Sequence, residues 1–105
     1  MMTRLFLVKD GEKELWVAAL VEEDVWTYVG NTGKFHYNEG ARHDYYFLNE
    51  LQYVDIGIAE AKRLIQAGVG TVDEDDLPDS ARRWREDPKG MDPEIVFASM
   101  AADLA

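Results

Sequence analysis

The sequence predicts an α+β fold: an N-terminal antiparallel meander of four to five strands, followed by two or three helices packed on one face. Short apolar segments alternate with turn signals in the N-terminal half. Residues 58–69 then repeat apolar side chains at helical spacing. With 105 residues, 47% of them hydrophobic, the chain is the size of one ordinary domain. We therefore interpret residues 1–105 as a single domain, with an exposed acidic linker at 71–80.

Four consecutive strands are expected before residue 39. Asp10-Gly11 and residues 31–33 are typical of tight turns, because glycine accepts positive φ angles. The second strand is apolar almost throughout, which indicates burial on both faces. The expected strands are residues 4–9, 15–21, 25–30 and 34–38.

Alternation along the strands predicts which side chains share a face. Trp26 and Tyr28 point to one side of the third strand. On the fourth strand His36 points away from its two aromatic neighbours. Residues 39–44 are polar and contain a glycine, so we interpret them as a loop. Either 45–48 or 51–54 forms a further strand, since short apolar runs do not distinguish strand from buried helix.

Three helices are expected in the C-terminal half. The first begins near Gly57, with Asp55 as a candidate cap, and the second covers 78–86 with proline in its tolerated first turn. The last begins after Asp92, which is a natural N-cap, with Pro93 in the first helical position.

Composition limits the classes of function. The chain has 21 acidic and 11 basic residues, a formal net charge of −10, which makes nucleic-acid binding unlikely. This acidity serves solubility or attracts a basic partner. There is no cysteine, which excludes disulfides, thiolate metal sites and a cysteine nucleophile. No apolar run resembles a membrane span or a signal peptide, so we expect a cytoplasmic protein. We also expect no cofactor, because no motif in the sequence is typical of a cofactor site.

The two histidines are weak candidates for a metal or catalytic site. Their spacing matches no zinc signature, so we expect no metal and interpret both as solvated. Asp44 follows His43 directly in the sequence. Because adjacent residues on a strand point to opposite faces, we do not interpret these two residues as a catalytic pair.

A basic cluster surrounds one tryptophan on this acidic chain. Arg82, Arg83, Trp84 and Arg85 resemble the residues that dominate protein interfaces. In the alternative interpretation, Trp84 covers an edge of the core and the arginines pair with the acidic linker or with the carboxylates that follow.

The apolar side chains of the C-terminal helix, which include Phe97, Met100 and Leu104, lie nearly all round it. Such a helix is buried or docks on a second chain, and a homodimer through this helix is one form of the second alternative.

The leading hypothesis is a small, acidic, non-catalytic interaction protein that binds another protein, either a basic one or a second copy. Its binding residues are then the basic cluster and the C-terminal helix. The alternative is a small-molecule binding protein or an enzyme with an aromatic-lined pocket. The candidate residues of that pocket are Trp26, Tyr28, His36, His43 and Asp44.

Overall fold

A computed structural model describes the backbone of residues 2–104 and the side chains of 2–103. It confirms the α+β order. The strands are β1 (Thr3–Asp10), β2 (Lys13–Val21), β3 (Asp24–Val29), β4 (Lys34–Tyr37) and β5 (Gln52–Ile56). The helices are α1 (Glu39–His43), the π-helical η1 (Asp44–Leu48), α2 (Ile58–Gln66), α3 (Pro78–Glu86) and α4 (Pro93–Leu104).

The strands form one antiparallel sheet in the order β4-β3-β2-β1-β5. The first four strands are the predicted meander, and Gly11 and Gly33 have φ angles of 62° and 70° in two of its turns. Of the two ambiguous segments, the later one forms the fifth strand. It pairs with β1, at the opposite edge of the sheet from β4.

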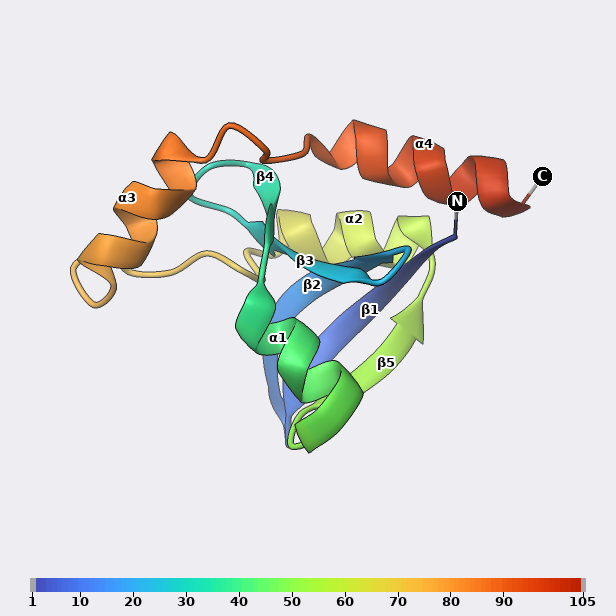
Figure 1. Ribbon diagram of the computed structural model, residues 1–105, viewed down its shortest axis with the longest axis horizontal. Helices are drawn as coiled ribbons and strands as arrows, with labels where there is room; N and C mark the ends of the chain where they lie inside the picture. The colour runs from blue at the N-terminus through green and yellow to red at the C-terminus, as the bar shows by residue number, and fades with distance from the viewer. Residues whose placement is uncertain (1, 105) are drawn as a thin grey trace.

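The chain between β4 and β5 must therefore cross the sheet, and it does so as α1 and η1 (Figure 1). The prediction of a loop at 39–44 is wrong. The Oδ1 atom of Asn38 accepts a hydrogen bond from the backbone N–H of Ala41 at 2.9 Å and caps α1. Gly40 suggested a loop, but an N-cap three residues before Ala41 was the stronger local signal.

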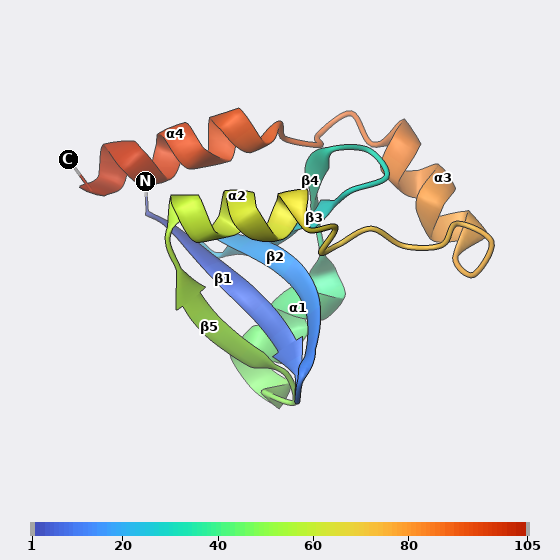
Figure 2. The ribbon, with the colours of Figure 1, turned by 180° about the vertical axis from the view of Figure 1, so that it is seen from behind.

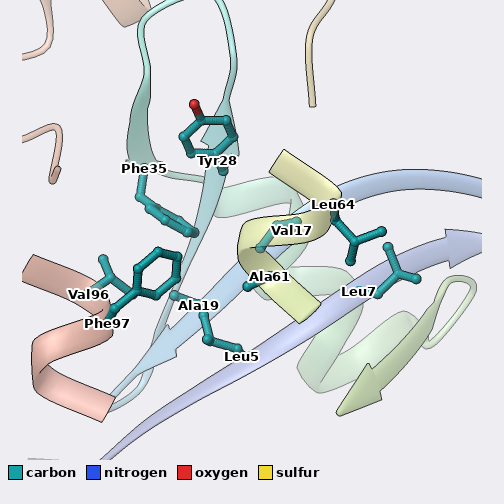
Figure 3. Close-up of a cluster of buried hydrophobic side chains, with 10 residues drawn as sticks. All are labelled: Leu5, Leu7, Val17, Ala19, Tyr28, Phe35, Ala61, Leu64, Val96 and Phe97. Atoms are coloured by element: carbon teal, nitrogen blue, oxygen red, sulfur yellow. The ribbon is translucent and has the colours of Figure 1, made fainter. Parts of the chain in front are cut away.

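Each face of the sheet carries its own apolar cluster, because side chains alternate along each strand. Leu5 and Leu7 point toward α2 and α4, whereas Phe6 and Val8 point toward α1. The prediction that residues 15–21 are buried on both faces is thereby explained. The larger cluster comprises Leu5, Leu7, Val17, Ala19, Tyr28, Phe35, Ala61, Leu64, Val96 and Phe97 (Figure 3).

Helices α2 and α4 lie over the same face, as expected. The N-cap of α2 is Gly57 rather than Asp55, whose carboxylate instead pairs with Arg4 at 2.8 Å. Helix α4 begins as predicted, and the carbonyl of Asp92 accepts a hydrogen bond from the third residue along. The far end of α4 is joined to β1 where the Thr3 N–H donates to Asp103 Oδ2 at 2.6 Å.

Helix α3 lies at the end of the molecule away from the C-terminus of α4 (Figure 2). It begins and ends where the sequence predicts, so residues 71–77 alone form the irregular part of the acidic linker. Asn31 fastens this segment to the β3–β4 turn: its side chain donates to the carbonyl of Val72 at 2.9 Å and accepts from the N–H of the same residue at 3.0 Å.

Among the helices described, none has the length and apolar character needed to cross a membrane.

Candidate functional site

The residues of the predicted aromatic pocket do not come together. Tyr28 belongs to the core cluster under α4, while His36 lies on the opposite face of the sheet. His43 is exposed at the end of α1, and Asp44 is the buried first residue of η1. Trp26 packs against the core beside Tyr28. Trp26 and Tyr28 thus share one face of β3, as the alternation predicts, but strand alternation and the crossover separate His36, His43 and Asp44 from them, so the five side chains do not line one pocket.

His36 is buried, so the expectation that it is solvated is also wrong. Its side chain is 3% exposed, and both ring nitrogens have partners. Nδ1 lies 2.8 Å from Oδ2 of Asp87, and Nε2 lies 2.7 Å from Oγ1 of Thr32 (both hydrogen bonds). Burial opposes ionisation of Asp87, but the hydrogen bonds from His36 and from the Lys89 N–H outweigh it and hold the Asp87 pKa below its ordinary value.

A cleft of about 570 Å³ opens beside this pair, between β4, the start of α1, and α3. His36 and Tyr37 of β4 line it together with Glu39 of α1. Helix α3 supplies Arg83 and Trp84. The sequence hypotheses assign His36 to a small-molecule pocket, and Arg83 and Trp84 to a protein-binding cluster. Only the packing of α3 against β4 makes them neighbours.

The basic cluster of α3 is largely engaged within the chain. The ring of Trp84 lies edge-on to that of Trp16, with centroids 6.4 Å apart, so it covers the edge of the core. Arg82 pairs with Asp79 at 3.2 Å, and Arg85 pairs with Glu74 of the acidic linker. The hydrogen bond from Arg85 lowers the pKa of Glu74.

Arg83 differs from its neighbours. Its guanidinium donates a hydrogen bond to Oγ of Ser80 at 3.1 Å. No carboxylate in the described part of the chain forms an ion pair with it. Arg83 is therefore the arginine of this cluster whose positive charge is available to a ligand.

The C-terminal helix does not offer the predicted binding face. Phe97 is 6% exposed and packs edge-on against Phe35, at a centroid distance of 6.4 Å (Figure 3). Met100 is half-buried against the same cluster. The side chain of Leu104 lies outside the described residues. Phe97 is thus a core residue rather than a binding residue, because α4 docks on the chain's own sheet.

A different apolar surface is open to solvent. Tyr46, Phe47 and Leu48 of η1 are 40%, 69% and 52% exposed. The Arg42 guanidinium lies 5.1 Å from the centre of the Tyr46 ring, and the His43 ring is 5.3 Å from that of Phe47. We call these five residues, Arg42, His43, Tyr46, Phe47 and Leu48, the η1 surface. A hollow of about 340 Å³ lies on it, bounded in addition by Glu23.

The buried carboxylate of Asp44 fixes the backbone turn that carries the η1 surface. This carboxylate accepts hydrogen bonds from the N–H groups of Glu50 and Leu51, at 3.1 and 3.2 Å, and from the hydroxyl of Tyr53 at 2.7 Å. Burial opposes ionisation, but these donors outweigh it and lower the Asp44 pKa. Burial and the same hydrogen bond raise the pKa of Tyr53. Asn49 closes the turn with a left-handed φ of 53°.

Among residues 2–104, no three histidine, aspartate or glutamate side chains gather closely enough to hold a metal ion. Comparison of the chain with protein-family models, curated proteins and solved structures finds no match in any of the three.

Proposed function

We propose that this protein is a non-catalytic interaction protein that binds a basic protein partner through the η1 surface. The observation that carries this proposal is the exposure of three successive large apolar side chains, Tyr46, Phe47 and Leu48, on a turn that is fixed from below.

The exposure of these three side chains is not caused by the lack of an apolar cluster beneath them. The face beneath them already has its own apolar cluster, against which Tyr45 of η1 and Tyr53 of β5 pack. Contiguous exposed apolar side chains often mark interaction sites, whereas isolated ones are ordinary. Single π-helical turns are also frequent at functional sites. The two features coincide at η1.

The charge of the chain indicates the character of the partner. A net charge of −10 attracts basic surfaces and repels a second copy of the same chain. Glu23 stands at the hollow. The one arginine of the η1 surface, Arg42, is already bonded to the carbonyl of Glu23 and lies 3.6 Å from Asp24. The expected ligand is therefore a segment that combines lysine or arginine with apolar side chains, and we place the interaction in the cytoplasm.

The test is selection of binders from a random peptide library displayed on phage, with the intact protein as bait. Peptides rich in both basic and apolar residues should be enriched. Their binding should weaken by at least about tenfold in Phe47→Ser, because aromatic anchors dominate interface energy. Phe47 is 69% exposed, so this variant should keep its circular dichroism spectrum.

Ile95→Ser is the matched control. Ile95 is 58% exposed on α4, which covers the other face of the sheet, and its loss should leave peptide binding unchanged. Enrichment of neutral or acidic peptides, or an equal loss in both variants, would refute the proposal. The hypothesis of a small-molecule site is supported by a separate observation, the cleft beside His36.

A further inference from the structure

We infer that the cleft between β4, α1 and α3 is a binding site for a small aromatic carboxylate. This site is independent of the η1 surface. Its volume of about 570 Å³ falls in the usual range of small-molecule pockets, about 300–1,000 Å³. The cleft combines one available cation, one fixed aromatic ring and a rigid polar wall.

Arg83 supplies the cation. The neighbouring arginines of α3 are each committed to a carboxylate, Arg82 to Asp79 and Arg85 to Glu74. Arg83 makes only the hydrogen bond to Ser80 among these polar contacts. A guanidinium has five N–H donors in a planar fork that fits a carboxylate with two parallel hydrogen bonds. Four of the five donors of Arg83 are free for such a ligand within the described contacts.

Trp84 supplies the aromatic surface. Trp84 is held in place by its edge-on contact with Trp16 and by His36, whose ring centre lies 6.5 Å away. A ring fixed in this way offers an apolar area to a flat ligand with little loss of side-chain freedom.

Buried His36 and its half-buried partner Asp87 form the rigid wall. Both ring nitrogens of His36 are occupied, so this side chain shapes the cleft and does not itself bind the ligand. The wall is fully hydrogen-bonded without a ligand. Binding therefore requires no rearrangement of it.

Glu39, on the α1 side, and Asp87 both line the cleft, and their negative charges oppose a second negative charge on the ligand. A singly charged carboxylate can pair with Arg83 at less cost than a doubly charged phosphate ester. This is why we choose the carboxylate class.

The experiment is titration of the ¹⁵N-labelled 105-residue protein with benzoate and 2-naphthoate, observed in the assigned amide and indole NMR spectrum. Both probes should give saturable shifts at the Trp84 indole N–H and at amides of α3. Phenyl phosphate should bind more weakly than benzoate. Benzylamine, which has the same ring and the opposite charge, should not saturate.

Two variants on the same helix decide the role of the cation. Arg83→Gln should weaken carboxylate binding by about tenfold or more, the scale of a lost charge-assisted hydrogen-bond pair. Arg82→Gln removes the same charge one residue away and should leave binding unchanged. Phe47→Ser should also bind both carboxylates normally, which separates this site from the proposed protein-binding surface.

The inference is overturned by any of three results. They are the absence of saturable shifts with both carboxylates, tighter binding of benzylamine than of benzoate, and an equal loss of binding in Arg82→Gln and Arg83→Gln. Equal loss in the two variants would mean that the carboxylate is attracted by the overall positive charge of α3 and does not bind at a defined site.

Discussion

His36 and Asp87 lie 51 positions apart in the sequence, and their Nδ1 and Oδ2 atoms meet at 2.8 Å. His36 belongs to the edge strand β4, and Asp87 follows the last residue of α3. The hydrogen bond is therefore a direct link between α3 and the sheet. The contact of Trp84 with Trp16 is a second link.

Replacing Asp87 should loosen α3. Asp87→Ala leaves the buried Nδ1 of His36 without its partner, which should lower the free energy of unfolding by about 1–3 kcal/mol. Amide hydrogen exchange in α3 should also become faster. Asp79→Ala is the control, because its pair with Arg82 is exposed and should contribute less than about 1 kcal/mol. Equal effects of the two changes, measured by urea unfolding, would contradict the link.

Replacing Asp44 should make stability depend less on pH. Because folding lowers the pKa of Asp44, the ionised carboxylate stabilises the folded state above the unfolded-state pKa of about 4, and this stabilisation is lost as the pH falls through the folded-state pKa. Asp44→Asn should thus cost about 1–3 kcal/mol at pH 7. The cost should shrink at lower pH.

Urea unfolding curves of both proteins at pH 7 and at acidic pH measure this difference. Asp75→Asn is the control: Asp75 is exposed in the linker, and its replacement should change stability by less than about 0.5 kcal/mol. A cost for Asp44→Asn that stays constant or grows toward acidic pH would show that the charge of Asp44 is not the stabilising feature.

Two neighbouring residues of α4 should respond very differently to truncation. Phe97 is buried against Phe35, so Phe97→Ala should lower the free energy of unfolding by about 3–5 kcal/mol. Ile95 is exposed, so Ile95→Ala should change it by less than about 0.5 kcal/mol. Thermal unfolding of the two variants measures the contrast. A stable Phe97→Ala protein would mean that α4 does not pack on its own sheet.

Local patterns account for the success of the element predictions. The end points of α3 and the start of α4 follow from proline in a first turn and from Asp92, signals that act within a few residues. Gly70 shows the limit of such signals. Its φ of 92° is a conformation that suits glycine, but a Cβ atom there would also lie 2.5 Å from the carbonyl oxygen of Tyr28. That second constraint comes from a distant strand.

The candidate sites depended on long-range packing. The sequence by itself determined the α+β order, the meander and the face that each strand residue occupies, because these follow from periodicity and turn chemistry. Only the tertiary structure decided that His36 is buried, that Phe97 is core and that Phe47 is exposed. Burial is not a property of a residue or its neighbours in sequence. It depends on which distant segment covers it, here α3 for His36, the sheet for Phe97 and no described segment for most of Phe47.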